Sequence, residues 1–311
     1  MPEIVLQTKA LTKRYGDLIA VSSLDLEVYQ GEVFGFLGPN GAGKTTSINM
    51  MCGLSKPDSG EVIINGNKLN GNSQMQRRVG ICPQNIILWN SLTCLEQLVF
   101  IGEMYDIPAK TSRQRGEQLL ESMELTEKRN KLAKTLSGGM QRRLNLIMAL
   151  VHDPDILVLD EPEAGLDPQS RVLVRDFIRS LARHKTVILT THNMDEAERV
   201  VDRVAIIDHG QLLAVDTPTA LKEKVGEGDV LEFAIQTSAN SDAITANLVK
   251  QFPDLTVSGN HFVLRGRGLV DLLPKIIETL QNEGCKPEDI RLRQNTLEDV
   301  FLTLTGRRLR E

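Results

Sequence analysis

Gly38-Pro39-Asn40-Gly41-Ala42-Gly43-Lys44-Thr45 is the most informative stretch of this 311-residue chain. The octapeptide has the GxxxxGK[ST] spacing, follows an apolar run at 33–37 and precedes a helical run at 46–54. A strand, a glycine-rich loop and a helix in that order predict a phosphate-binding loop. The glycines permit left-handed turns and leave backbone N–H groups open to an oxyanion, so the loop is expected to hold a polyphosphate.

The residues that close this loop have separate expected roles. Lys44 is placed to reach the β and γ phosphates, and the Thr45 hydroxyl is expected to bind a magnesium ion that bridges them. The positive end of the helix that follows favours the same anion. Thr46 lies in the first turn of that helix and is therefore included in the predicted site. Gly38 through Thr46 therefore form the predicted phosphate site.

A second half of a phosphate-handling site is predicted at Ile156-Leu157-Val158-Leu159-Asp160-Glu161. The apolar strand delivers two carboxylates to its C-terminal end, where ligands bind in open α/β sheets. Asp160 is expected to hold the magnesium, directly or through water, and Glu161 to orient or deprotonate the attacking water. A plain strand ending at Asp-Glu-Pro is the alternative, and the loop at 38–45 in the same chain argues against it.

Composition narrows the class of protein. The chain is 41% apolar and 25% charged, with a net charge of -5 and a pI of about 5.7, which argues against a nucleic-acid partner. The four cysteines, Cys52, Cys82, Cys94 and Cys285, are widely spaced and suggest buried thiols. We see neither a signal peptide nor an apolar run long enough for a membrane span, so a soluble chain is expected, and any membrane role needs a partner.

The length and the hydrophobic pattern predict two domains. Residues 1–227 have the pattern of an α/β domain with a helical subdomain at about 85–150, and a parallel sheet includes the strands at 156–159 and 187–189. A helix is expected from Pro168 to about residue 183, and the strands at 4–6, 21–28, 61–65, 79–82, 204–207 and 212–215 complete this domain. The polar segment at 222–228 is expected to end it.

Residues 228–311 show a strand, helix, strand, strand, helix, strand order and a closing helix from Leu297. This order predicts a small α+β, ferredoxin-like domain. We find no nucleophile, metal cluster or phosphate loop in it.

A second anion-binding helix end is predicted at Leu136-Ser137-Gly138-Gly139-Met140-Gln141. Ser137 is a good N-cap, and the paired glycines allow an anion to approach the helix that begins near Gly139. Simple helix capping is the alternative. One nucleotide seldom needs two such helix ends from the same subunit.

With these motifs, residues 4–225 resemble the nucleotide-binding subunits of ABC transporters, in which two cassettes dimerise head to tail. In that family each ATP lies between the phosphate loop of one copy and the Ser-Gly-Gly signature of the other. The resemblance implies an ATPase with ATP and Mg²⁺, a homodimer, a separate integral membrane permease, and a cytoplasmic position on the inner face of the membrane. It also implies further contacts with ATP from Ser137, Gly138, Gly139 and Gln141.

The resemblance assigns four more positions. Tyr15 matches the aromatic residue that stacks on adenine, and Gln84 matches the glutamine that senses magnesium and water. Asp167, in Gly165-Leu166-Asp167, lies in the loop that crosses to the second cassette, and His192 matches the histidine that contacts the γ phosphate. The other four histidines are interpreted as surface or helix-end residues. Glu163 and Met148 depart from the family pattern, in which a small or neutral residue and an arginine are usual.

The partner and the direction of transport depend on two further segments. Trp89, with Leu88 and Leu92, is expected to receive a permease helix, or alternatively to lie in the core of the helical insert. The tail at 296–306 resembles that of drug and antibiotic exporter ATPases, so export of a drug, an antibiotic or a lipid-like compound is expected. The same resemblance implies that the domain at 228–311 is accessory and stabilises or regulates the dimer; a plain amphipathic closing helix is the alternative for the tail. An importer ATPase and a soluble ATPase of translation or DNA repair remain alternatives, although the single acidic cassette without heptads disfavours the soluble one.

Overall fold

The structure is a computed structural model that describes residues 3–69, 77–182, 184–225, 229–235, 241–266, 268–283, 285 and 287–306. The chain divides into two compact units between Pro218 and Thr219. The sequence-based boundary at 227 lies further along, because the polar segment expected at 222–228 begins within a helix, α8 (Pro218–Val225), and contains its second half. That helix belongs to the second unit from Thr219 onward.

The first unit is built on a six-stranded sheet in the order β10-β9-β3-β8-β7-β6. Strands β6, β7, β8, β3 and β9 are parallel, and β10 pairs antiparallel with β9. All residues of β3 and β7 are buried, as expected for parallel strands covered on both faces. The strands are β3 (Val33–Leu37), β6 (Val79–Cys82), β7 (Ile156–Asp160), β8 (Thr186–Thr191), β9 (Arg203–Asp208) and β10 (Gln211–Asp216).

An antiparallel sheet in the order β2-β1-β4-β5 completes the core of this unit. Its side chains share an apolar cluster with Phe34, Phe36 and Ile156 of the parallel sheet. Two of its strands are much longer than the apolar runs suggested, because their pairing continues to the turn at Gly16 and Asp17. The strands are β1 (Ile4–Tyr15), β2 (Leu18–Tyr29), β4 (Ser59–Ile64) and β5 (Asn67–Lys68).

Helices of the α/β part start at the ends of strands. Helix α1 (Lys44–Met51) follows β3, and α6 (Pro168–Leu181) begins with the expected proline and with Asp167 as its N-cap. A short helix, α7 (Met194–Glu198), follows β8. The loops between strands and helices therefore meet at the carboxyl ends of the parallel strands.

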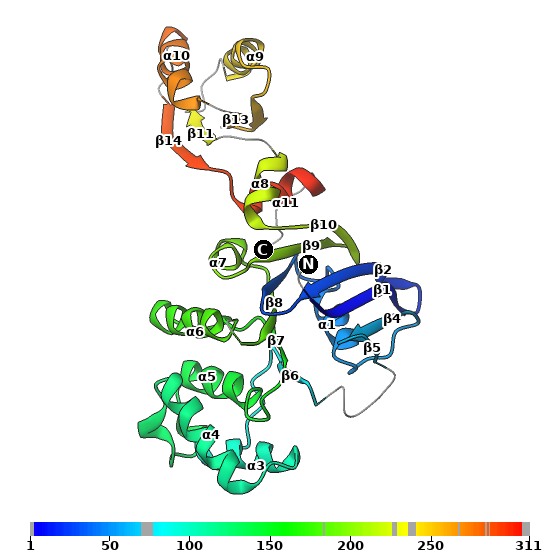
Figure 1. Cartoon of the computed structure of the whole chain (residues 1–311). Coiled ribbons are helices and arrows are strands. Elements are labelled where there is room, and N and C mark those ends of the chain that lie inside the picture. Colours follow the sequence, from blue (N-terminus) through cyan, green and yellow to red (C-terminus); the bar gives the residue numbers. More distant parts are fainter. Residues whose placement is uncertain are drawn as a thin grey trace. The chain divides into compact units, whose positions relative to one another are not determined.

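The helical subdomain contains α3 (Cys94–Met104), α4 (Ala109–Ser122) and α5 (Gly138–Met148), with short 3-10 turns at Thr126–Lys128 and Ala133–Thr135. Figure 1 shows these helices beyond the β6 and β7 end of the sheet. The helical pattern was expected from residue 85, but the first helix begins only at Cys94, where Thr93 forms a capping box with Glu96. Residues 85–93 lack regular secondary structure.

The second unit has the predicted ferredoxin-like order of elements. Its antiparallel sheet runs β12-β13-β11-β14, which is the strand order of that fold. Phe233 and Phe262 stack in its core with ring centroids 5.1 Å apart. The elements are β11 (Asp229–Ile235), α9 (Ser241–Gln251), β12 (Thr256–Ser258), β13 (His261–Gly266), α10 (Leu269–Asn282), β14 (Pro287–Gln294) and α11 (Leu297–Thr305).

Two other expectations bear on the whole chain. All four cysteines are free thiols in buried positions, as expected. No helix in the described part of the chain is long and apolar enough to cross a membrane.

Candidate nucleotide-binding and hydrolysis site

The loop from Gly38 to Gly43 is held close to neighbouring backbone. A Cβ on Gly38 would lie 2.2 Å from the Ile207 carbonyl oxygen, and one on Gly43 would lie 2.3 Å from that of Ala20. Gly43 also has a φ of 100°. Both positions therefore require glycine, and the loop can bring its N–H groups to an anion at the start of α1.

Lys44 lies under this loop with only 7% of its surface exposed. Its Nζ donates to the carbonyl oxygens of Gly38 at 2.8 Å and Pro39 at 3.1 Å. Burial lowers the pKa of Lys44, and the carboxylates of Glu161 and Asp160 oppose that shift. The ammonium group is thus poised beside the acidic residues where a triphosphate would place its terminal phosphates.

A cavity of about 530 Å³ opens over the loop, within the size range of small-molecule sites. It brings together residues that are far apart in the chain. The predicted residues among its lining are Tyr15, Asn40, Gly41, Gly43, Lys44, Thr45, Thr46, Gln84, Asp160 and Glu161. The predicted loop residues Pro39 and Ala42 do not line it: Ala42 is buried, and its N–H donates to the Pro39 carbonyl at 3.2 Å within the loop.

The cavity also has lining residues that the sequence reasoning missed. Leu18, Ile19 and Ala20 lie at the start of β2, next to the expected adenine residue Tyr15. His209, interpreted from sequence as a surface residue, is exposed but lines the same cavity. Because Tyr15 lies at a turn, the strand residues that follow it could have been predicted to line the same site. No sequence pattern indicates that His209 does so.

The oxygen atoms expected to hold magnesium lie together. Thr45 Oγ1 donates to Asp160 Oδ2 at 3.2 Å, and the Thr190 hydroxyl donates to Asp160 Oδ1. A hydroxyl beside a carboxylate suits a hard cation that keeps some waters and phosphate oxygens as ligands. The residues described contain no cluster of three His, Cys, Asp or Glu residues for a metal, so phosphate oxygens would have to complete the shell.

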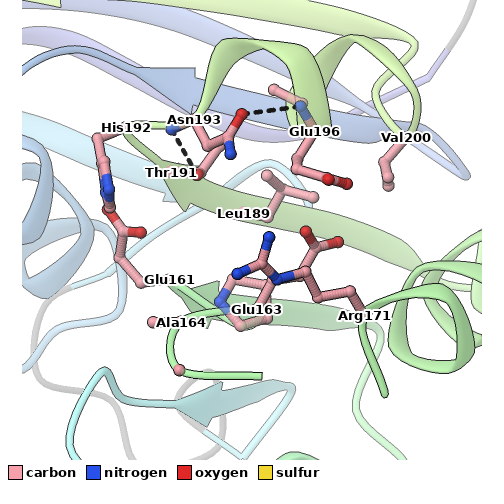
Figure 2. A pocket seen from close by; sticks show the side chains of 13 residues that line it. Glu161, Glu163, Ala164, Arg171, Leu189, Thr191, His192, Asn193, Glu196 and Val200 are labelled. Atoms are coloured by element: carbon pink, nitrogen blue, oxygen red, sulfur yellow. Dashed lines mark hydrogen bonds and ion pairs between the residues drawn. The ribbon is translucent and has the colours of Figure 1, made fainter. Parts of the chain in front are cut away.

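Glu161 and His192 form a hydrogen-bonded pair at the edge of the site. Nδ1 of His192 lies 2.9 Å from Oε1 of Glu161, and Figure 2 shows the two side chains facing each other. Glu161 is only 6% exposed and has a positive φ of 51°. Its N–H donates to Thr190 Oγ1 at 3.0 Å, so Thr190 orients both acidic residues. Sequence reasoning missed this threonine, although it lies just before Thr191 and His192 on the same strand end.

The signature residues lie outside this cavity in the single chain. Ser137 caps α5 by accepting the Met140 N–H at 3.3 Å, and the helix starts at Gly138 rather than near Gly139. Asp167 caps α6 by accepting from Ser170, and a Cβ on Gly139 would lie 3.7 Å from its Oδ2. The structure thus brings the two predicted interface motifs together, but away from the phosphate loop.

Gln141 is held within its own chain. Its Nε2 donates to the carbonyl oxygens of Ala133 at 3.2 Å and Leu136 at 3.3 Å. Both amide hydrogens are therefore used in bracing the turn before α5, and only Oε1 is left for a ligand. Its contact with ATP stays a prediction.

Two titratable side chains have surroundings that the sequence did not indicate. His152 follows the end of α5 and is half-buried: its ring stacks on Tyr105 with centroids 3.9 Å apart, and burial lowers its pKa. Glu163 lines a second cavity, shown in Figure 2, where its carboxyl group faces that of Glu196. Burial and the neighbouring Glu196 raise the pKa of Glu163 to about 7, while Arg175 and Arg171 oppose the shift.

Comparison with known proteins defines the class. The family model described as "ABC transporter" matches residues 21–164. The chain is 36% identical to the daunorubicin resistance ATP-binding protein DrrA3 of Streptomyces coeruleorubidus, over 100% of this chain and 99% of that protein. It is 34% identical to the linearmycin resistance ATP-binding protein LnrL of Bacillus subtilis (strain 168), over 99% and 100%.

A third relative and a solved structure also indicate an ATP-binding subunit of the ABC transporter family. Identity is 38% to the Nod factor export ATP-binding protein I of Ralstonia nicotianae (strain ATCC BAA-1114 / GMI1000), over 99% of this chain and 95% of that protein. A dimeric ATP-binding cassette in a post-hydrolysis state, bound to ADP and Pi, aligns with a TM-score of 0.63 at 27% identity. That alignment covers 68% of this chain and 98% of the cassette.

The chain belongs to the ABC transporter family. Within that family it is an ATP-binding and ATP-hydrolysing subunit of the exporter type. The predicted fold class, an α/β P-loop NTPase, is confirmed.

Proposed function

We propose that two copies of this chain clamp two ATP–magnesium complexes and use their hydrolysis to drive a separate integral membrane permease. The observation that carries this proposal is the separation of the two anion-binding motifs. The phosphate loop lines the cavity with Asp160 and Glu161, whereas Ser137, Gly138 and Gly139 lie elsewhere in the same chain. A head-to-tail partner supplies the second set, as the dimeric cassette structure supports.

The roles within each site follow from the contacts described above. Lys44 and the loop amides hold the β and γ phosphates, Tyr15 stacks on the adenine, and Thr45, Asp160 and Gln84 serve the magnesium ion. A magnesium ion held there would neutralise charge that develops on the transferred phosphoryl group. Glu161 orients or deprotonates the attacking water, and His192 holds Glu161 and contacts the γ phosphate.

The permease is proposed to dock on an apolar surface formed by the helical subdomain and neighbouring residues of the α/β part. Trp89, Ile87 and Leu54 are 38%, 58% and 63% exposed, and they line a hollow of about 350 Å³ together with residues of α3 and α5. Trp89 packs edge-on against Phe100, and the exposed part of its side chain is available to a partner. An exposed apolar hollow of this kind suits the end of an amphipathic helix, here one presented by the permease on the inner face of the membrane.

We propose a drug, an antibiotic or a lipid-like compound as the transported substrate. The named relatives act in daunorubicin resistance, linearmycin resistance and Nod factor export. These names also favour export over the importer and over a soluble, non-transport ATPase. The second unit is proposed to stabilise or regulate the dimer, because its tail at 296–306 resembles that of exporter ATPases in which this segment has such a role.

Dimer formation tests the proposal directly. Glu161→Gln protein, which can bind but not hydrolyse ATP, should change from monomer to dimer in light scattering when magnesium and ATP are added. Lys44→Ala in the same background is the matched control and should remain monomeric. A Glu161→Gln protein that stays monomeric at saturating magnesium and ATP, with the permease present, overturns shared ATP binding.

A further inference from the structure

Arg142 occupies an unusual position in the first unit. Its side chain is 2% exposed, lies on the second turn of α5 and reaches the carboxyl ends of two neighbouring strands. Nε donates to the Pro162 carbonyl at 3.2 Å, and Nη1 donates to those of Pro83 at 3.0 Å and Gln84 at 2.6 Å. Nη2 donates to the carbonyl oxygens of Asp160 at 2.8 Å and Glu161.

These contacts use the complete donor set of the guanidinium group. Arginine has five N–H donors, one on Nε and two on each Nη, and here each one has a carbonyl acceptor. A buried cation without such partners would be strongly unfavourable. The carbonyl oxygens belong to the last residue of β7 and to the segments that follow β6 and β7, and these segments carry Gln84 and Glu161.

The helix that carries Arg142 links this contact to the other motif. Ser137, Gly138 and Gly139 form the N-terminus of α5, and Arg142 follows them in the same rigid helix. In the proposed dimer the helix start touches the partner's ATP, while Arg142 holds the residues that act on its own. A shift of α5 is therefore transmitted to the backbone of Gln84 and Glu161 in the same protomer.

We propose that Arg142 is a positioning residue that joins the signature helix to Gln84 and Glu161, and so couples the two ATP sites of the dimer. This inference rests on the proposed function. Because all five donors of Arg142 are bonded to backbone carbonyl oxygens, it acts through the backbone that it holds. Its loss should therefore slow turnover and reduce cooperativity while ATP binding is kept.

Arg143 provides a matched control on the same helix. It is also buried, at 8% exposure, but its Nη1 donates to the Met123 carbonyl at 2.8 Å, within the helical subdomain. Lysine at either position keeps the charge but has three donors that cannot match a planar array of acceptors. Comparison of Arg142→Lys with Arg143→Lys therefore separates loss of the contacts between α5 and the backbone at Gln84 and Glu161 from the general effect of replacing a buried arginine.

The experiment measures kcat, KM, the Hill coefficient for MgATP and the Kd of ATP, using the full chain. Arg142→Lys should lower kcat by about 10- to 100-fold, bring the Hill coefficient toward 1 and leave the Kd within about twofold. Arg143→Lys should retain kcat within about twofold. Melting temperatures of both variants monitor folding.

Each outcome decides the matter. If Arg142→Lys keeps parental kcat and cooperativity, or if both lysine variants lose activity equally, the positioning role is overturned. Glu161→Gln separates this failure from failure of the proposed function. An inactive Glu161→Gln beside a fully active Arg142→Lys removes only the inference, whereas equal rates for Glu161→Gln and the parent remove both.

Discussion

The imidazole of His192 lies 2.9 Å from the carboxylate of Glu161, and the two side chains belong to the segments that follow neighbouring parallel strands. Because β7 and β8 end at the same edge of the sheet, the pair forms without any sequence proximity. The backbone N–H of Glu161 is held by Thr190 at 3.0 Å, so the carboxylate is oriented from two sides. Hydrolysis should depend on this geometry more than ATP binding does.

Glu161→Gln should reduce ATP hydrolysis by about 100-fold or more, because an amide cannot accept the proton of the attacking water. The Kd of ATP should change little, since Lys44 and the loop amides remain. Phosphate release and equilibrium binding measure the two effects. Hydrolysis by Glu161→Gln at the parental rate would show that another group activates the water.

Lys44→Ala should weaken ATP binding itself. The ammonium group is the buried cation of the phosphate site, and a hydrogen bond to a charged group typically contributes about 1.5–3 kcal/mol, or roughly 10- to 100-fold in Kd. Titration calorimetry measures this loss. Lys13→Ala, which removes a lysine near Tyr15 but outside the phosphate loop, is the control and should bind several-fold better than Lys44→Ala. Equal Kd values for Lys44→Ala and the parent would contradict the assignment.

Trp89→Ala should leave the ATPase activity of the isolated chain within about twofold and reduce permease capture by at least about 10-fold, as for a central aromatic contact. The permease is recovered from membranes with tagged chain and quantified. Val172→Ala is the matched control, because Val172 is also exposed, at 44%, but lies on α6. Unchanged capture and coupling in Trp89→Ala would exclude this surface as the docking site.

Stability of the first unit should fall as the pH rises toward 8. The pKa of Glu163 is about 7 in the folded protein against an ordinary value of 4.5, because burial and Glu196 disfavour its charged form. Between these values the folded state binds more protons than the unfolded state, so the free energy of unfolding decreases with pH. Glu163→Gln should flatten this dependence in denaturant melts at pH 5 and pH 8, whereas the exposed Glu117→Gln should not. An equally steep decrease in Glu163→Gln would contradict the assignment.

Asp299→Asn should destabilise the second unit by about 3 kcal/mol, as for breaking a buried ion pair. Asp299 is 1% exposed, and its Oδ1 accepts from Nη2 of Arg293 and from Nη2 of Arg265, each at 3.0 Å, while its Oδ2 accepts from Nη1 of Arg293 at 2.5 Å. Burial acts to raise the pKa of Asp299, but hydrogen bonds from Arg293, the Thr296 N–H and Arg265 prevail and hold it well below its ordinary value. The stabilisation is therefore present above about pH 4 and is lost as the pH falls further.

Calorimetry of the full chain follows the transition of this unit. Asp289→Asn is the control, because its pairing with Arg291 at 2.7 Å is solvent exposed and should contribute no more than about 1 kcal/mol. If both variants melt alike, the Asp299 ion pairs do not stabilise the unit.

Most of the strand-based architecture was predictable because its signals are local. The apolar runs at 156–160 and 186–191 and the glycine spacing around Lys44 reflect short-range requirements of buried strands and of a phosphate loop. The first residues of the helices were harder to predict from the sequence. The loop before Cys94 has apolar side chains such as Ile87 and Trp89, and their exposure depends on neighbouring elements rather than on helical periodicity.

Sequence alone therefore determined the phosphate loop, the acidic strand end and the order of the ferredoxin-like elements, because each requires certain residue types at fixed spacing. Only the tertiary structure decided that Thr190 orients Asp160 and Glu161, that His152 stacks on Tyr105, and that Arg142 spans the ends of β6 and β7. These contacts join segments that are distant in the chain. The stack follows from the packing of the ends of α3 and α5, whereas the contacts of Thr190 and Arg142 arise from the parallel pairing of strands, which places remote loops at one edge. No local pattern encodes which side chain fills the space between such segments.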